Sequence, residues 1–397
     1  MKPTIFGLVT IVAVGGLAAV FWGSSPSADA LAKRAGNAFM ERRYDEAAAD
    51  LARVNRLRSP TALDSMLLGQ LAMVGGRTDE AVEALAKVPD DYPLAAQARL
   101  QAGQLELRRS RYVPAERLLL DSVRLDPKAV QARRELIYLY GMQLRRPELG
   151  AMFRDLSKLT PLNYSEVFLW CLTRGVTWDA REVVETQTKC LEADPDDRWA
   201  RLGLAEALRE SSRLDEAERA LTPLPESDPK ARAARARIAL ERGDDQGAEA
   251  ILAAGPADDL DLSLLRGRFA LARGDGPEAV RQFRVAHAQS PNLREAVIGL
   301  GQALKLSGDE AAAAPLLEEA RNHERLGTLV QKAAVEANRD DPALVRDLAA
   351  ACASIGRYPE ARAWYNLAIT RDPFDIAAQD GMARLKQLEA QAAPPAG

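Results

Sequence analysis

Two hydrophobic patterns divide the chain. Residues 4–22 form an uncharged and almost wholly apolar run, TIFGLVTIVAVGGLAAVFW. Beyond Ala30, apolar and small residues instead alternate with charged ones, a pattern that predicts many amphipathic helices packed against each other. Short polar turns such as Gly274-Asp275 and Gly308-Asp309 separate these helices in pairs. The pattern therefore predicts an all-α chain of helical hairpins that follows one apolar segment.

Proline marks the period of the helical series. Because proline lacks an amide N–H and restricts the residue before it, it ends a helix rather than continuing it. Five prolines lie 34 residues apart in succession: Pro93, Pro127, Pro161, Pro195 and Pro229. The spacing slips after Pro229, resumes at Pro291 and slips again before Pro373. We therefore expect each 34-residue unit to be one helical hairpin, with proline in the connection to the next.

The 34-residue units resemble the tetratricopeptide repeat. That repeat places small residues where the two helices of a hairpin meet and larger residues in the spaces between hairpins. The sixth unit fits this arrangement well, with Leu204-Ala205, Leu208, Asp215-Glu216-Ala217, Leu221 and Pro229. The eighth also fits, with Gly267, Ala270, Gly274-Asp275, Ala279, Phe283, Ala286 and Pro291. The resemblance implies an α-solenoid, a right-handed superhelix of about ten such hairpins.

The apolar run and the repeats together predict the domain organisation. We expect a signal-anchor or transmembrane helix at 1–23, a linker at 24–30, a repeat solenoid at 31–392 and a disordered tail at 393–397. An extra helix is expected near 326–341, and a capping helix with a polar outer face at 374–392. Changes of superhelical curvature are expected near 243–260 and near 326–341.

The apolar run predicts export. Its nineteen residues are about enough to cross a bilayer and exceed the usual ~7–15 residue core of a cleaved signal peptide. Lys2 precedes the run and no positive charge follows until Lys33, which places the repeats outside the cytoplasm. The expected location is the cell envelope, as a single-pass inner-membrane protein with periplasmic repeats. Cleavage after Ala30, at Ala28-Asp29-Ala30, stays open and would release a secreted protein.

Composition and charge narrow the possible functions. The net charge is −4 and no long basic run occurs, so nucleic-acid binding has no electrostatic footprint. Phosphate-binding loops, dinucleotide fingerprints and nucleophile elbows are absent from the sequence. The two histidines, His287 and His323, are interpreted as surface helix residues without a metal partner. We therefore expect no catalytic residue, no metal, no cofactor and no small-molecule substrate.

The cysteines form a candidate disulfide. The resemblance places Cys171 and Cys190 at facing positions of the fifth repeat, where Ala or Gly normally stands. An exported protein can carry a disulfide there. The alternative interpretation is a pair of small buried apolar residues, and Cys352 is interpreted in the same way, as a core thiol.

In tetratricopeptide repeat proteins, the first helix of each hairpin lines a concave groove that binds a protein or peptide. The corresponding positions here give candidate groove residues: Arg108, Arg134, Tyr138, Trp199, Arg209 and Arg268. An arginine near an aromatic ring can grip an extended peptide or its carboxylate, and solvated helix residues are the alternative interpretation. The resemblance thus implies a non-catalytic protein-interaction scaffold or adaptor. An assembly factor for an envelope pathway, of the lipopolysaccharide or cytochrome maturation type, is the alternative.

Overall fold

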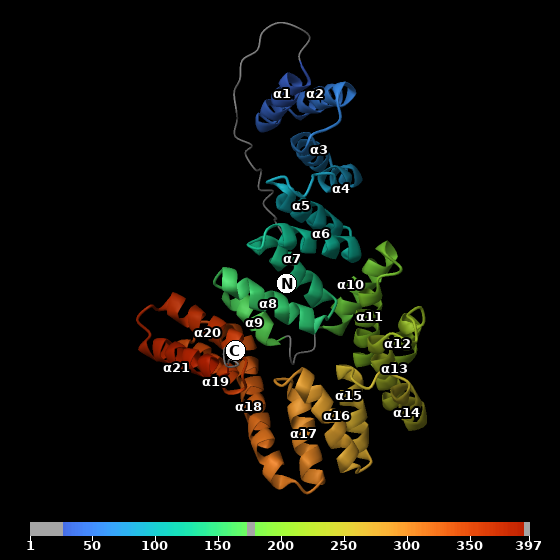
Figure 1. The fold of residues 1–397 in the computed structure, drawn as a ribbon, viewed down its shortest axis with the longest axis vertical. Helices are drawn as coiled ribbons and strands as arrows, with labels where there is room; N and C mark the ends of the chain where they lie inside the picture. The colour runs from blue at the N-terminus through green and yellow to red at the C-terminus, as the bar shows by residue number, and fades with distance from the viewer. Residues whose placement is uncertain (1–26, 173–178, 393–397) are drawn as a thin grey trace. The chain divides into compact units, whose positions relative to one another are not determined.

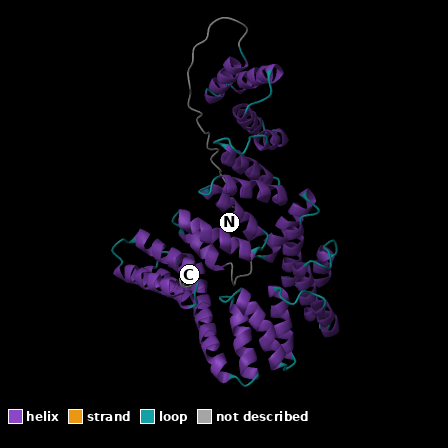
Figure 2. Ribbon diagram, viewed as in Figure 1, coloured by secondary structure: helices purple, strands orange, loops and turns teal. Residues whose placement is uncertain are grey.

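The computed structural model describes residues 27–172 and 179–392, and these residues are helical almost throughout (Figure 2). They contain twenty-one α-helices and one short 3₁₀-helix, and no β-strand occurs within these two ranges. The chain divides into two compact units, with the boundary between Ala132 and Arg133.

Unit 1 consists of three helical hairpins (Figure 1). Its helices are α1 (Ala28–Met40), α2 (Tyr44–Leu57), α3 (Ala62–Val74), α4 (Thr78–Ala86), α5 (Ala95–Arg108) and α6 (Tyr112–Leu125). The helix that follows, α7 (Val130–Met142), spans the boundary between the units.

Unit 2 contains the remaining helices (Figure 1). They are α8 (Arg146–Leu159), α9 (Tyr164–Leu172), α10 (Ala180–Ala193), α11 (Arg198–Glu210), α12 (Leu214–Leu221), α13 (Pro229–Glu241), α14 (Asp245–Ala253), α15 (Leu260–Ala272), α16 (Gly276–Gln289), α17 (Arg294–Leu306), α18 (Glu310–Ala334), η1 (Glu336–Asn338), α19 (Pro342–Ser354), α20 (Tyr358–Arg371) and α21 (Ile376–Ala392). The odd-numbered helices up to α19 are the first helices of hairpins. The predicted all-α array of helical hairpins is confirmed for the residues that the structure describes.

The hairpin turns within the described residues are of one kind. A residue with positive φ follows the end of the first helix, and the next amide donates back to the carbonyl five residues earlier, as Arg77 N does to Ala72 O at 2.9 Å. Glycine takes the positive-φ place at five turns, for example Gly76 and Gly274. Arg42, Ser110, Leu144 and Ser212 take it at four others, although a Cβ makes this conformation costly. Helix packing therefore holds those four turns in a shape that their own residue disfavours.

Small residues let the two helices of a hairpin approach closely, as the sequence predicted. A Cβ added to Gly69 on α3 would lie 2.6 Å from Leu85 on α4, and one added to Gly103 on α5 would lie 2.8 Å from Leu119 on α6. Gly267 meets the ring of Phe283 in the same way. Each pair is separated by 16 residues in the chain. Any side chain at these positions would therefore force the facing residue of the second helix to shift.

The prolines lie in the connections between hairpins or begin the next helix. Pro161 and Pro195 follow the ends of α8 and α10, which is the predicted role. Pro229 instead is the first residue of α13, because α12 already ends at Leu221. A proline fits that first position because the amide it lacks would have no partner inside the helix.

The separate helix predicted near 326–341 is wrong. α18 continues from Glu310 to Ala334 as one helix of 25 residues, and only η1 follows before α19 begins at Pro342. Gly327 lies two residues after Arg325 but is itself helical, and no proline follows until Pro342, so α18 continues past the expected place. The capping helix is present as α21, and it begins at Ile376 instead of 374. The predicted changes of curvature stay predictions.

Unit 2 closes on itself. α20 packs against α8 and α9, and α18 also contacts α9, although α9 precedes both by much of the unit (Figure 1). Tyr164 on α9 donates its hydroxyl to Ala333 O at 2.8 Å and lies edge-on to Trp364 at 5.6 Å between ring centroids. A simple repeat array has contacts between neighbouring repeats alone. This closure was not predicted from the sequence.

The predicted membrane segment, within residues 1–23, and the predicted tail, 393–397, lie outside the described residues. Within 27–172 and 179–392, no helix combines the length and the apolar character needed to cross a membrane.

Candidate functional site

The first helices of unit 2 form a continuous surface. α11 packs on α13, α13 on α15, and α15 on α17, so their outward side chains share one side of the stack. We call the surface of these four helices the first-helix face. Trp199, Arg209 and Arg268, three of the predicted groove residues, belong to its helices α11 and α15.

Predicted groove arginines are held by carboxylates from the next first helix. On α7, Arg134 donates from Nε to Glu166 of α9 at 2.8 Å. On α15, Arg268 pairs with Glu295 of α17 at 2.8 Å. These arginines therefore connect neighbouring hairpins, and a ligand that contacts them must replace a carboxylate.

Ion pairs between neighbouring first helices are most closely grouped at the centre of the first-helix face. Arg209 donates to Glu206 on its own helix at 2.8 Å and to Glu241 on α13. Lys230 on α13 donates to Asp261 on α15 at 2.9 Å. Arg237 approaches the same carboxylate at 3.7 Å. We call these six residues, Glu206, Arg209, Lys230, Arg237, Glu241 and Asp261, the central charge cluster. It carries three acids and three bases.

Two acids of the central charge cluster, Glu206 and Asp261, are stabilised in their charged form. Burial by itself would raise the pKa of Glu206, but the hydrogen bond from Arg209 and the charge of Arg237 hold that pKa below its usual value. Burial likewise opposes ionisation of Asp261, and the charges of Lys230 and Arg237 lower its pKa. The hydrogen bond to Glu206 raises the pKa of Arg209. Glu206, Arg209 and Asp261 are therefore charged at neutral pH.

Two guanidinium groups lie over the rings of Trp199. Arg145 sits 4.3 Å and Arg198 4.4 Å from the centroid of a Trp199 ring. Arg145 is itself buried and also lies over Tyr140 at 4.4 Å. Trp199 is half-buried, so part of the indole is covered and part reaches solvent. Arg198 is adjacent in sequence, but Arg145 comes from another hairpin and no sequence signal pointed to it.

The backbone under Trp199 is fixed by a buried carboxylate. Asp197, which is fully buried, accepts from the amides of Trp199 at 2.8 Å and Ala200 at 2.9 Å and so caps α11. Its other oxygen accepts from Gln143 Nε2 at 3.2 Å and from Cys190 Sγ at 3.3 Å. The position of Trp199 is therefore set by groups from three separate segments.

The predicted disulfide between Cys171 and Cys190 is wrong. Both residues are buried free thiols, which agrees with the alternative interpretation of small core residues. Cys190 faces Asp197, whereas Cys171 Sγ lies 3.7 Å from Cys352 Sγ and accepts from Trp364 Nε1 at 3.1 Å. Cys171 lies away from Cys190 because unit 2 closes, and this closure packs α9, which carries Cys171, against α20.

The remaining candidates have separate environments. Tyr138 on α7 is 41% exposed, and its pKa is raised mainly by partial burial. Arg108 is exposed at the end of α5 in unit 1. His287 is partly exposed, but His323 is buried in α18 with Nε2 3.9 Å from Glu319, so its prediction as a surface residue is wrong. α18 packs against both α17 and α19, so more of its surface is covered than in a helix at the edge of the array.

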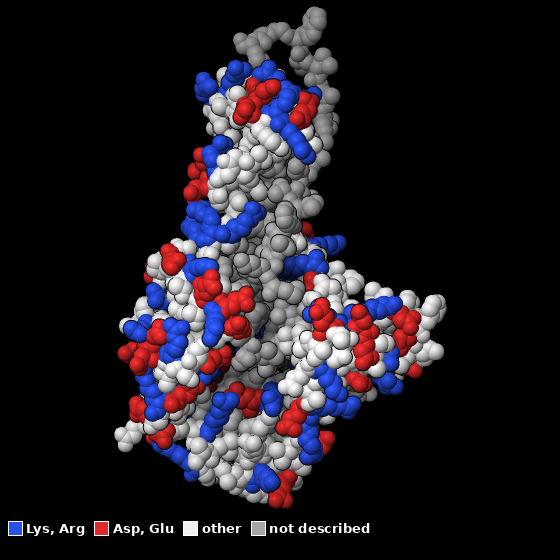
Figure 3. Space-filling model, turned by 180° about the vertical axis from the view of Figure 1, so that it is seen from behind, with Lys and Arg blue, Asp and Glu red and all other residues white. Residues whose placement is uncertain are grey.

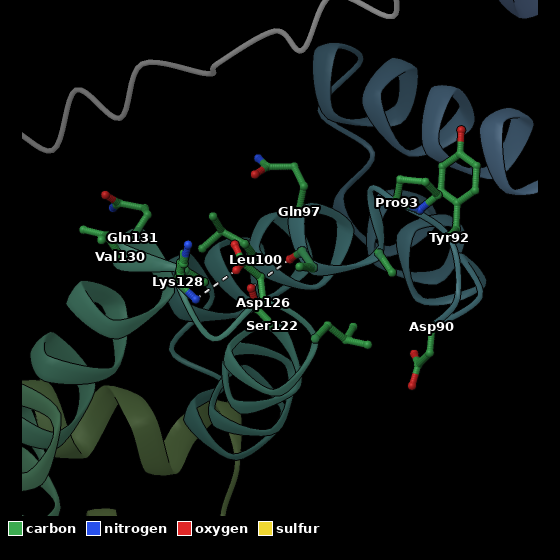
Figure 4. Close-up of a pocket in the computed structure, with 14 residues that line it drawn as sticks. Asp90, Tyr92, Pro93, Gln97, Leu100, Ser122, Asp126, Lys128, Val130 and Gln131 are labelled. Carbon is green, nitrogen blue, oxygen red and sulfur yellow. Dashed lines mark hydrogen bonds between the residues drawn. The ribbon is translucent and has the colours of Figure 1, made fainter. Parts of the chain in front are cut away.

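Unit 1 has a hollow of its own (Figure 4). A cavity of about 590 Å³ lies between α5, α6 and the segment that leads into α7. Gln97 and Leu100 of α5 and Gln131 and Val130 of α7 line it. At its base Ser122 donates to Ala96 O at 2.8 Å. The lining mixes polar and apolar groups.

Charges of both signs are mixed on the surface. On the face that Figure 3 shows, Lys and Arg side chains are interspersed with Asp and Glu. This agrees with the ion pairs between neighbouring hairpins described above.

Family models of the tetratricopeptide repeat match residues 66–130 and 331–376, and another such model matches residues 179–238. The chain contains tetratricopeptide repeats. The matched repeats include α4 to α6, α10 to α12, and α19 and α20, so they cover Trp199, Arg209 and the α20 side of the closure, whereas α8 and α9 lie outside the matched ranges. Among curated proteins, none matches the sequence as a relative.

Solved structures to which the chain is similar include the following three. A repeat protein from Parabacteroides merdae is 18% identical, with 61% of this chain and 98% of that chain covered and a TM-score of 0.33. The Cut9–Hcn1 hetero-tetramer of the APC/C is 16% identical, with 91% of each chain covered and a TM-score of 0.34. PilW, a type IV pilus biogenesis factor, is 20% identical, with 52% of this chain and 98% of that chain covered and a TM-score of 0.27.

Tetratricopeptide repeats in general are non-catalytic and bind protein partners, and the present fold is consistent with a protein-interaction scaffold.

Proposed function

We propose that the chain is a non-catalytic scaffold that binds an extended segment of a partner protein in the groove of its first helices. The observation that carries this proposal is the half-buried Trp199, whose rings contact the guanidinium groups of Arg145 and Arg198. A tryptophan held rigid in this way offers apolar area to a ligand without a further loss of side-chain freedom. Tyr138 adds a second, more exposed aromatic on α7.

The ion pairs of the first helices divide into exchangeable and fixed ones. Exposed pairs contribute about 0–1 kcal/mol, so a ligand carboxylate can replace the protein's own at little cost. Arg134 and Arg268, with side chains 40% and 57% exposed, are of this kind. Arg209, with 17% exposed, is held by two glutamates and belongs to the framework. We propose that partner carboxylates bind at Arg134 and Arg268, and that the central charge cluster keeps the helices in register.

Photo-crosslinking in cells tests the proposed binding surface. A photoreactive amino acid at position 138 should give an adduct with a specific protein, identified by mass spectrometry. Trp199→Ala in the same chain should lower the yield of that adduct at least about tenfold, as expected for loss of an aromatic anchor. Phe374→Ala is the matched control, because Phe374 is 87% exposed and lies outside the first helices. Equal losses from both variants, or no adduct at position 138, would refute the proposal.

We propose further that residues 4–22 anchor the protein in the inner membrane with its repeats outside the cytoplasm. The support is the uncharged run of nineteen residues, with Lys2 before it and no positive charge until Lys33. Protease added to intact spheroplasts should digest the repeats, and the intact mass of the membrane fraction should include the run. A mature chain that begins at Leu31 would show cleavage after Ala30 and a secreted protein instead. Protection of the repeats from protease would contradict both.

A further inference from the structure

Two cysteines and a glutamate meet where unit 2 closes. Cys171 belongs to α9, Cys352 to α19 and Glu360 to α20. All three are buried, and one ligand atom from each lies within 4.8 Å of the others. The two Sγ atoms are 3.7 Å apart, although their residues are separated by 181 positions in the chain. The cluster therefore exists because the last hairpin packs on α9.

The separation of the two sulfur atoms fits a shared metal ion. Zinc bound by thiolates has Zn–S distances of about 2.3 Å and tetrahedral angles, which place two sulfur ligands about 3.8 Å apart. Two thiolates and a carboxylate are also a ligand set that zinc accepts. Trp364 Nε1 donates to Cys171 Sγ at 3.1 Å, and a hydrogen bond to a ligand sulfur orients and stabilises it as a thiolate.

The buried charges of the cluster balance when a divalent ion is bound. Arg357 forms an ion pair with Glu360, and both side chains are no more than 5% exposed. With the thiols protonated, this pair is neutral by itself. When a divalent cation binds, two thiol protons leave, and two thiolates and one carboxylate face one cation of charge two and one arginine. Neither state leaves a net charge in the interior, which would be costly.

We propose that Cys171, Cys352 and Glu360 bind a zinc ion. The three side chains supply three ligands, and a water molecule takes the fourth position of the tetrahedron. The ion joins α9 to the hairpin of α19 and α20 and so stabilises the closed form of unit 2. This metal site is independent of the proposed binding surface at Trp199.

Cobalt titration of the full chain, reduced and stripped with a chelator, tests the site. One Co²⁺ per chain should give a near-ultraviolet thiolate-to-cobalt charge-transfer band, and Zn²⁺ should remove the band by displacement. Cys171→Ser and Cys352→Ser should abolish it. Cys190→Ser is the matched control, because Cys190 is also a buried free thiol of unit 2 but faces Asp197. Glu360→Gln should weaken Zn²⁺ binding at least about tenfold.

Alkylation of the unaltered protein gives a test that does not depend on the folding of variants. Under partly denaturing conditions, Zn²⁺ should slow the alkylation of Cys171 and Cys352 several-fold, as peptide mass spectrometry would show, and leave Cys190 unaffected. A missing charge-transfer band, a band that survives both cysteine substitutions, or equal protection of all three cysteines would overturn the proposal.

Discussion

Replacing Trp364 by alanine should open unit 2 far from the substitution in sequence. Trp364 is fully buried on α20, and its indole contacts both Tyr164 and Cys171 of α9. If these contacts hold the closure, their loss should loosen α9. The hydrogen-bonded residue of α9, Cys171, precedes Trp364 by 193 positions in the chain. In an array whose repeats contact only their neighbours, the same substitution would loosen α19 to α21 alone.

The size of the effect follows from the two contacts. Truncation of a buried tryptophan to alanine costs about 3–5 kcal/mol in total. Of this, the edge-on contact with Tyr164 accounts for about 0.5–1.5 kcal/mol and the hydrogen bond to Cys171 for about 1 kcal/mol. The closure thus loses about 1.5–2.5 kcal/mol. Because about 1.4 kcal/mol is a factor of ten, amides of α9 should exchange about 10–60 times faster.

Hydrogen–deuterium exchange read by peptide mass spectrometry measures this directly. Phe283→Ala is the matched control, because Phe283 is also a buried aromatic but packs between α15 and α17 at Gly267 and Gly299. It should speed exchange in α15 to α17 and leave α9 unchanged. The closure would be refuted if Trp364→Ala left the α9 peptides at their original rate while α20 exchanged faster.

Two further predictions concern stability. Gly299→Ala would place a Cβ inside the contact distance of the Phe283 ring and should destabilise by about 1–3 kcal/mol in thermal unfolding, whereas Gly327→Ala, with nothing near its Cβ, should stabilise by about 1 kcal/mol. Burial alone would raise the pKa of Asp228, but Arg198 and two backbone amides lower it below its usual value. Its stabilising effect should be full near pH 7 and decline below about pH 4, so the difference in Tm between the protein and Asp228→Asn should shrink on acidification; a constant difference would contradict this.

The repeat architecture could be predicted because it depends on local signals. Gly69 and Gly267 mark close helix contacts, and turn residues such as Gly274 and Gly308 mark the ends of first helices. Each of these features involves residues within about twenty positions of one another, so it can be recognised in the sequence of a single repeat. The length of α18 was missed because the repeat period placed a stop at Arg325, where the sequence has a good helix former instead of a proline, and the helix continues through Gly327.

The closure and the details of the candidate site could not be predicted, since they depend on residues far apart in the chain. Trp199 was identified as a groove residue, but the covering Arg145 comes from the turn between α7 and α8. The family pattern implied a partner for Cys171 within its own hairpin. In the structure, the cysteine next to Cys171 is instead Cys352, from a distant hairpin. Periodicity describes neighbours in a stack and contains no information about contacts between its ends.

The closure also has a consequence for biosynthesis. The ribosome completes α9 long before Trp364, and at about 5–20 residues per second the intervening 193 residues take about 10–40 s to make. During that interval Cys171 lacks the cover that α19 and α20 provide in the finished protein. Unit 2 therefore cannot be completed hairpin by hairpin as its chain emerges. Its early helices must be protected by a chaperone or remain incompletely folded until the last hairpin has been synthesised.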